Sequence, residues 1–180
     1  GSLQSMRPMP DHVARELDAN LVFTRLRGHA RDGAALGQAR ASEWREDLNE
    51  ALAVARQVGR EVVIIASSTG ASLVVAAAAS DPEAMERVKG IVLISPNFGV
   101  TDPKAALLHL PAGRYWVPWI AGRQWGFEPQ NAQHAQFWTH KYPSTALFPM
   151  AAIARAASLS EHGQITQPAL FYYSEADKIV

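Results

Sequence analysis

Residues 61–79 read EVVIIASSTGASLVVAAAA, and this stretch decides the fold. Val62 to Ile65 form a continuous apolar run rich in β-branched side chains, which is typical of a strand buried on both faces of a parallel sheet. Ala71 to Ala79 contain strong helix formers and neither Gly nor Pro, so we expect a helix there. The stretch therefore predicts a strand, a sharp turn at residues 66–70, and a helix.

The turn has small residues on either side of a serine. Ala66 and Gly70 lie two residues before and after Ser68, where a strand that turns directly into a helix is expected to crowd its own backbone. Ser68 would then lie at the apex in a strained conformation, with its hydroxyl above the sheet. An apex at Ser67 would place β-branched side chains at both crowded positions, so the pattern favours Ser68. A Ser- and Thr-rich helix N-cap is the alternative interpretation.

The composition is that of a neutral domain without cysteine. The chain of 180 residues has 17 Lys and Arg against 17 Asp and Glu, so its net charge does not argue for nucleic acid or an anionic membrane as a partner. The lack of cysteine excludes disulfides, thiolate zinc sites and a Cys nucleophile. No apolar run is long enough for an integral membrane segment, and the first residues lack the apolar core of a signal peptide. We expect a cytoplasmic protein, and a homo-oligomer stays open.

The residues before the decisive stretch predict two helices and a strand. Asp11 to Leu17 have the spacing of a short amphipathic helix. Leu21 to Leu26 form a strand candidate that ends at the loop of residues 27–30, where His29 is expected to be a loop residue. Ser42 to Val58 predict the clearest helix of the chain, because their apolar residues recur at helical spacing.

The residues after the decisive stretch predict two more buried strands. Gly90 to Ser95 and Ala169 to Tyr173 are the strand candidates, and Ser144 to Leu159 predict a helix interrupted by Pro149. Two buried strands separated by one helix form a βαβ unit, whose strands are parallel. The sequence therefore predicts the α/β class, with a mostly parallel sheet flanked by helices.

Residues 97–143 differ in character from the rest of the chain. Pro and Gly recur there, helical periodicity is poor, and the segment contains four of the five tryptophans. Exposed aromatic side chains in such a segment would line an apolar pocket, although packing onto the core explains many of them equally well. The pocket candidates are Trp116, Trp119, Trp125, Phe137 and Trp138. His109, His134 and His140 lack metal-ligand spacing, and we expect neither a metal nor a cofactor.

The pattern as a whole resembles the α/β-hydrolase family, whose nucleophile elbow is usually written G-x-S-x-G. Ala66 replaces the first Gly of that motif, and the strand at Ala169 to Tyr173 is similar to the family's acid strand. The resemblance implies a catalytic triad with Ser68 as nucleophile and Asp177 as acid, Glu175 being the less favoured acid. It also implies that the backbone N–H of Thr69 is an oxyanion donor.

The resemblance divides the chain into three parts. Residues 1–96 would form the hydrolase core with the nucleophile elbow, residues 97–143 a cap over the active site, and residues 144–180 the return to the core with the acid strand. The family takes its base from a histidine after the acid and places a further strand between Leu21–Leu26 and the elbow strand. We expect both of these parts to lie outside the sequence.

The activity implied by the resemblance is two-step acyl transfer. A small-molecule carboxylic ester with an apolar acyl group would acylate Ser68, and water would then release the acid. The segment LQSMRP, together with an aromatic cap, looks most similar to the carboxylesterase and monoacylglycerol-lipase branch.

Two other classes of protein stay open. A non-catalytic hydrolase-fold protein would keep the elbow serine and lack the base. A nucleotide-binding domain would use Ser67 to Ser72 as a phosphate loop at a helix N-terminus. It is disfavoured because the turn has neither G-x-G-x-x-G nor a Gly-Lys-Ser/Thr.

Overall fold

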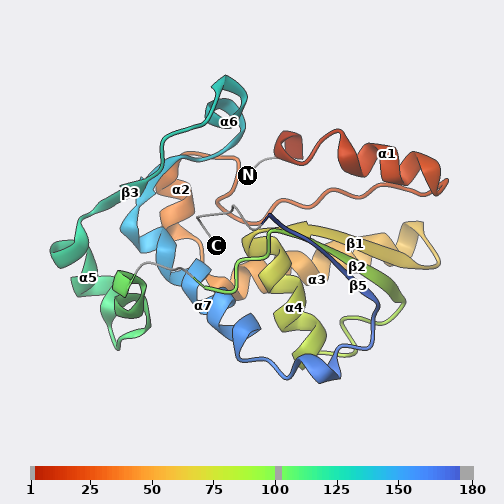
Figure 1. Cartoon of the computed structure of the whole chain (residues 1–180). Helices are drawn as coiled ribbons and strands as arrows, with labels where there is room; N and C mark the ends of the chain where they lie inside the picture. The colour runs from red at the N-terminus through yellow and green to blue at the C-terminus, as the bar shows by residue number, and fades with distance from the viewer. Residues whose placement is uncertain (1–2, 100–102, 175–180) are drawn as a thin grey trace.

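A computed structural model describes residues 3–99 and 103–174 of the chain. Three parallel strands form the main sheet in the order β1 (Val62–Ser67), β2 (Val88–Ile94) and β5 (Ala169–Tyr172) (Figure 1). The helix α4 (Thr69–Ser80) connects β1 to β2. The predicted unit of strand, helix and parallel strand is therefore confirmed, and so is the α/β class.

The helix α4 is the centre of the hydrophobic core. Each of the residues 71–78 is at most 6% exposed. A helix that is apolar on all sides is stable only when protein surrounds it. Around α4 lie the sheet, α3 (Ala41–Val58), α7 (Leu147–Ser158) and η4 (His162–Gln164). Because α4 packs against other elements on several sides, the core also fixes the position of the turn that precedes this helix.

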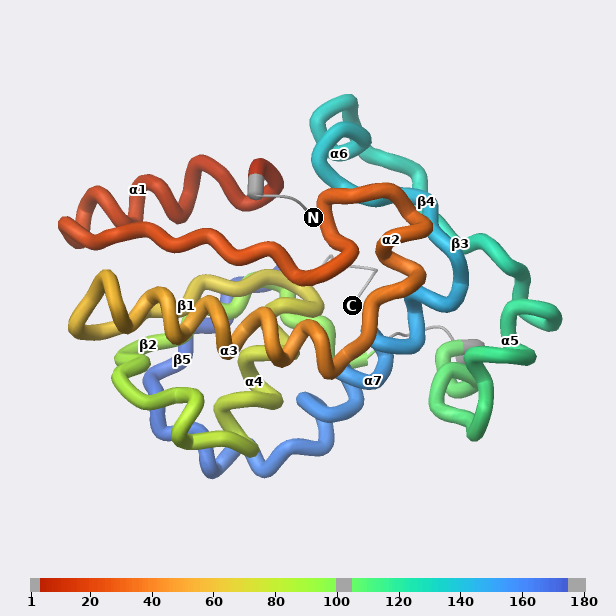
Figure 2. The backbone as a smooth tube through the Cα atoms, turned by 180° about the vertical axis from the view of Figure 1, so that it is seen from behind, coloured from red at the N-terminus to blue at the C-terminus, as the bar shows by residue number. Residues whose placement is uncertain are grey.

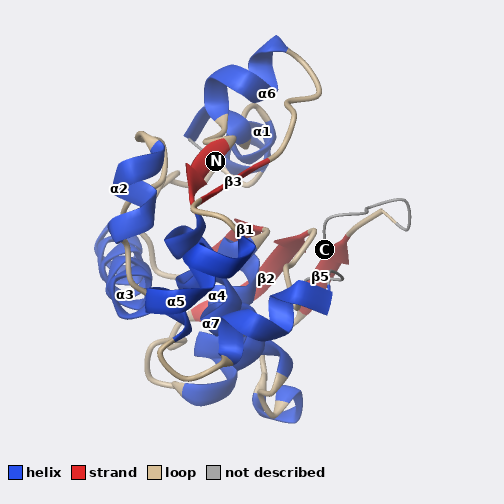
Figure 3. Ribbon diagram, turned by 90° about the vertical axis from the view of Figure 1, so that its left-hand side faces the viewer, coloured by secondary structure: helices blue, strands red, loops and turns tan. Residues whose placement is uncertain are grey.

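The sheet buries only one of its faces within the described residues. Figure 3 shows α3, α4 and α7 on the same side of the strands, and on that side Ile91 and Leu93 are 3% and 1% exposed. On the opposite face Val63 and Leu170 are 49% and 60% exposed. The prediction of strands buried on both faces is therefore wrong here. Alternate side chains of a strand point to opposite faces, and the helices of residues 3–99 and 103–174 cover one of these faces.

The helices before β1 agree with the predictions, whereas the predicted strand does not form. The helices α1 (Met9–Glu16) and α3 lie where they were expected, and the short α2 (Gly33–Gln38) is an addition. Leu21 to Leu26 have no strand assignment, and the segment runs beside α3 (Figure 2). No described strand lies next to this segment to complete a backbone ladder, and β1 is itself an edge strand.

Pro149 does not interrupt the helix in which it lies. The 3-10 helix η3 (Ser144–Ala146) leads directly into α7, and Pro149 is the third residue of α7. The first N–H groups of a helix have no intrahelical partner, so a proline in the first turn removes little. The prediction of an interrupted helix is therefore wrong.

The segment between β2 and η3 forms a lobe of its own. Its elements are η2 (Pro103–His109), α5 (Gly113–Ala121), β3 (Gln124–Gly126), α6 (Ala132–Phe137) and β4 (Lys141–Pro143). The strands β3 and β4 pair antiparallel. Figures 1 and 3 place this lobe on the side of the molecule toward which the strands of the main sheet end. Its position is compatible with a cap over the ends of these strands.

The helix α2 fixes the lobe to the N-terminal part of the chain. A Cβ at Gly33 would collide with the Lys141 carbonyl oxygen and would lie 2.8 Å from the Tyr142 Cα, so α2 approaches β4 at backbone distance. The Thr139 hydroxyl donates a hydrogen bond to the Arg31 carbonyl over 3.1 Å.

Among the helices in residues 3–99 and 103–174, none is long and apolar enough to cross a membrane.

Candidate active site

Ser68 lies in a strained turn at the carboxyl edge of the sheet. Its backbone has φ 51° and ψ −126°, a conformation that costs free energy in a non-glycine residue. The Ser68 N–H donates to the Ile94 carbonyl over 2.9 Å, and the Ser68 carbonyl accepts from the N–H groups of Ala71 and Ser72 over 3.0 and 3.2 Å. The predicted strained apex is confirmed at Ser68, held by β2 on one side and α4 on the other.

Thr69 begins α4 and is 7% exposed. The third and fourth N–H groups that follow Ser68 bond back to its carbonyl. In the part of the chain that the structure describes, the N–H groups of Thr69 and Gly70 donate to no acceptor. Unpaired donors at the positive end of a helix suit an oxyanion that develops next to the serine. This geometry is compatible with the predicted role of Thr69.

The crowding expected at Gly70 is absent among the described residues. A Cβ built on Gly70 would have no heavy atom within 4 Å apart from its chain neighbours and the backbone of its own helix, and Gly70 lies in the first turn of α4 without a positive φ. The steric argument for a small residue is therefore wrong at this position. Ala66 does pack against the hydrophobic core. Gly70 instead leaves the side of the turn open.

Ser72 ties the elbow to the loop after β2, and sequence reasoning did not identify it. Its side chain is completely buried, and its hydroxyl donates to the Asn97 carbonyl and contacts the Ser68 carbonyl at 3.3 Å. The Asn97 N–H also donates to the Ser68 carbonyl over 3.4 Å. The signal that could have pointed to Ser72 is a polar residue inside an otherwise apolar helix.

The loop after β2 also connects to β5. Ser95 has φ 42°, and its N–H donates to the Tyr172 carbonyl over 2.8 Å. The ends of the three parallel strands are therefore joined around the turn at Ser68. The predicted acid Asp177 and its alternative Glu175 follow β5 and lie outside the described residues, so the structure assigns them no position.

Histidines in the described residues make packing contacts away from Ser68, and none of their hydrogen bonds or ring contacts reaches it. The His29 ring lies 5.2 Å from the Trp44 ring in an edge-on arrangement, and burial lowers the pKa of His29 to about 4. His134 stacks on Phe127 with ring centroids 5.1 Å apart. The contact with Trp44 agrees with the expectation that His29 is a loop residue, and His134 packs against a neighbouring ring.

The aromatic candidates of α5 and β3 face solvent to different extents. Trp119 is 73% exposed. Trp125 is 41% exposed, and its ring centroid lies 5.5 Å from the Tyr142 ring centroid. Trp116 is half-buried, and its indole N–H donates to the Pro111 carbonyl over 3.2 Å. Among the ring contacts of residues 3–99 and 103–174, none joins two of these three side chains.

The aromatic candidates of α6 are both half-buried. Phe137 ends the helix, and Trp138 follows it with its ring edge-on to His134 at 5.3 Å. The helix itself packs against η1 (Leu3–Ser5) at the start of the chain. Ring contacts recorded for residues 3–99 and 103–174 do not join either side chain to Ser68.

Two surface hollows lie against α3, away from the elbow. One has a volume of about 230 Å³ and is lined by Asn49, Leu52, Arg56, Asp81, Glu83 and Ala84. The other, of about 190 Å³, lies between α3 and residues 22–25. Neither includes Ser68.

The described residues also contain no group of three His, Cys, Asp or Glu side chains that could hold a metal ion.

A parallel α/β sheet with a strained serine turn between a strand and a buried helix defines a hydrolase type of fold. The model of the alpha/beta hydrolase family matches residues 3–178. The chain therefore belongs to the alpha/beta hydrolase family.

Solved structures agree with this assignment. Among 26 matching chains is one from the metagenome-derived lipolytic enzymes LipS and LipT. It aligns with a TM-score of 0.80 and 25% sequence identity, over 100% of this chain and 70% of its own length. No curated protein matches the sequence. Family and fold together indicate a hydrolase with similarity to lipases and esterases.

Proposed function

We propose that the protein is a serine hydrolase that cleaves carboxylic esters of apolar acyl groups through an acyl-enzyme intermediate. The observation that carries this proposal is the strained backbone of Ser68, with φ 51° and ψ −126°, at the turn between β1 and α4. Such a turn exposes a serine hydroxyl above the edge of the sheet. Family membership and the lipolytic structural neighbour support ester hydrolysis as the reaction class.

The proposed mechanism has two acyl-transfer steps. The Ser68 oxygen attacks the ester carbonyl carbon while a histidine base, oriented by Asp177, takes the hydroxyl proton. The carbonyl oxygen becomes anionic and accepts a hydrogen bond from the Thr69 N–H. The bond to the alcohol then breaks, and the base returns its proton to the leaving alcohol. Water then attacks the carbonyl carbon of the acyl-enzyme in the same way, and this second step releases the acid and restores Ser68.

We propose that the acyl group of the substrate binds against the aromatic side chains of the lobe between β2 and η3. Phe137 and Trp138 are the first candidates, because both are half-buried in a lobe on the side where the strands end (Figure 3). Trp116 is half-buried as well, and Trp125 lies in β3 opposite Tyr142 of β4. Aromatic rings of this kind offer apolar surface to an acyl chain.

Labelling with a fluorophosphonate, followed by peptide mapping, tests the proposal. We expect one adduct on Ser68 and turnover of a p-nitrophenyl ester, both lost in Ser68→Ala. The matched control is Ser67→Ala at the last residue of β1, which should keep both. A protein that takes no label, or one labelled elsewhere, would contradict the proposal and leave a non-catalytic member of the family.

A further inference from the structure

The outward side of α5 is apolar although it faces water. Val117 points to the interior and is 3% exposed, whereas Tyr115, Trp119 and Ile120 are 79%, 73% and 73% exposed. Tyr115 and Trp119 lie one turn apart on the helix, and Ile120 follows on the same side. The outer side of a surface helix is normally polar. The exposed apolar side of α5 is therefore a candidate docking surface.

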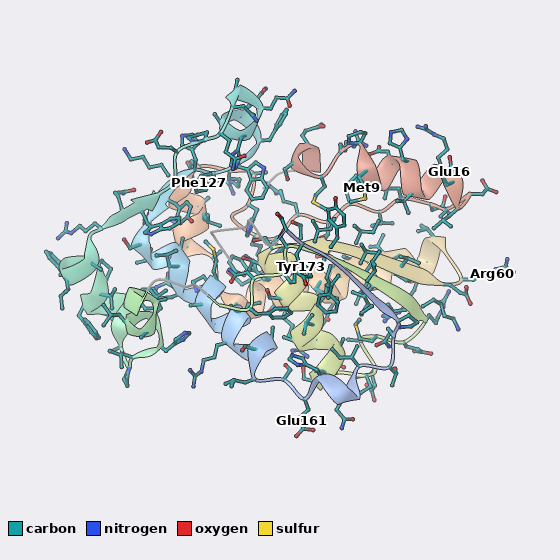
Figure 4. All side chains as sticks on the ribbon, viewed as in Figure 1. Met9, Glu16, Arg60, Phe127, Glu161 and Tyr173 are labelled. Carbon is teal, nitrogen blue, oxygen red and sulfur yellow. The ribbon has the colours of Figure 1, made fainter. Side chains whose placement is uncertain are left out.

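The helix lies at the margin of the molecule. Figures 1 and 2 show α5 at the end of the lobe in two opposite views. Figure 4 shows its side chains extending outward, with no other element beyond them. A flat surface can therefore approach this face without meeting the rest of the described chain.

A cation lies against this face. The Arg123 guanidinium lies 3.8 Å from the Trp119 ring centroid, at the end of α5. From Pro103 to Phe127 the sequence contains Lys104, Arg114 and Arg123 but no Asp or Glu. Arg114 is engaged internally, because it donates to the Gly37 carbonyl over 2.9 Å. Tyr115, Trp119 and Ile120 thus combine with the Arg123 cation on the exposed side of α5.

This combination distinguishes between the partners that could cover α5. In a symmetric dimer the face would meet its own copy, which would bring the two copies of Arg123 together. An anionic lipid surface supplies a counter-charge, and Trp and Tyr rings prefer the boundary between headgroups and acyl chains.

We propose that the α5 outer face, formed by Tyr115, Trp119, Ile120 and Arg123, docks the protein on the surface of an anionic phospholipid membrane. The apolar side chains enter the headgroup boundary, and Arg123 pairs with lipid phosphates. The side of the molecule at which the strands end then faces the lipid (Figure 1). Docking does not require a catalytic step and goes beyond the proposed hydrolysis.

Co-flotation with vesicles tests the proposal on the full chain. We expect binding to phosphatidylcholine vesicles that contain about 30% phosphatidylglycerol and weaker binding to pure phosphatidylcholine. Trp119→Ser should lower the partition coefficient on anionic vesicles about tenfold, and Arg123→Ala should remove most of the preference for anionic lipid. The matched control is Leu159→Ser after α7, because Leu159 is 69% exposed but lies outside α5. Ser68→Ala should bind vesicles as the parent does, whatever its activity.

Three outcomes would overturn the proposal. The first is that the parent protein does not bind anionic vesicles. The second is that Trp119→Ser binds them as well as the parent does while keeping its circular dichroism spectrum. The third is that the parent binds neutral and anionic vesicles equally. Light scattering identifies the competing partner. A dimer that Trp119→Ser converts to a monomer, without vesicle binding, would assign the face to a second copy of the chain.

Discussion

Ser68 keeps its strained conformation because its neighbours satisfy the backbone on both sides of the turn. A residue in this region of φ and ψ costs about 1–3 kcal/mol, and the hydrogen bonds to Ile94, Ala71 and Ser72 offset that cost. A small-residue motif was enough to predict the apex at Ser68. Ser72 could not be predicted in this way, because its importance comes from the Asn97 carbonyl, which is distant in sequence.

Ser72→Ala should weaken both the fold and the proposed reaction. The substitution removes a fully buried donor and leaves the Asn97 and Ser68 carbonyls with fewer partners, which costs about 1–2 kcal/mol of unfolding free energy. Because the turn loosens, kcat should fall more than KM rises. Urea unfolding and ester kinetics measure the two effects. Ser158→Ala, at an exposed position of α7, is the matched control and should change neither.

His29 should make the stability of the protein depend on pH. Burial lowers its pKa from 6.5 to about 4, so between these values the unfolded chain binds more protons than the folded one. The free energy of unfolding therefore falls as the pH drops from about 6.5 toward 4, by up to about 3 kcal/mol. His29→Phe keeps a ring against Trp44 and should flatten this pH dependence.

The measurement for His29 is the urea midpoint between about pH 7 and pH 4. His12→Phe makes the same exchange at an exposed position of α1 and should retain the parent's slope. Parallel slopes for the parent and His29→Phe would show that His29 does not carry the effect.

At the scale of elements, the sequence predicted where helices and strands lie better than it predicted which faces and edges of the strands are covered. The pattern of apolar residues located α3, α4 and all three parallel strands to within a few residues. It could not tell which faces are covered, because Val63 and Leu170 are as apolar as Ile91 but face away from the helices. Leu21 to Leu26 failed as a strand for a related reason: a strand needs a neighbour, which local composition does not report.

The contact between α2 and β4 should be sensitive to a single methyl group. In Gly33→Ala the new Cβ would meet the Lys141 carbonyl and the Tyr142 backbone, and neither can move without shifting the strand. We expect a loss of about 2–3 kcal/mol of unfolding free energy. Gly163→Ala in η4 is the matched control, because its Cβ would meet no atom within 4 Å. Equal urea midpoints for the two variants would contradict the close approach of α2 to β4.

At the scale of the whole molecule, charge is balanced overall but unbalanced locally. The 17 basic and 17 acidic residues cancel, whereas residues 103–127 contain cations only. Net charge sets the long-range field, and local charge sets contacts within a Debye length. Composition could therefore exclude a globally basic protein but could not predict the α5 outer face, which depends on which side chains the fold exposes.

This difference between net and local charge predicts that salt affects ester hydrolysis and vesicle binding to different extents. Because the net charge is zero, the kcat/KM for an uncharged p-nitrophenyl ester should change by less than about twofold between about 20 and 500 mM sodium chloride. Flotation with anionic vesicles should weaken over the same range, since Arg123 makes an exposed ionic contact that salt screens. A steep fall of kcat/KM with salt would indicate that charged groups near the elbow bind the substrate, against the apolar acyl specificity proposed for it.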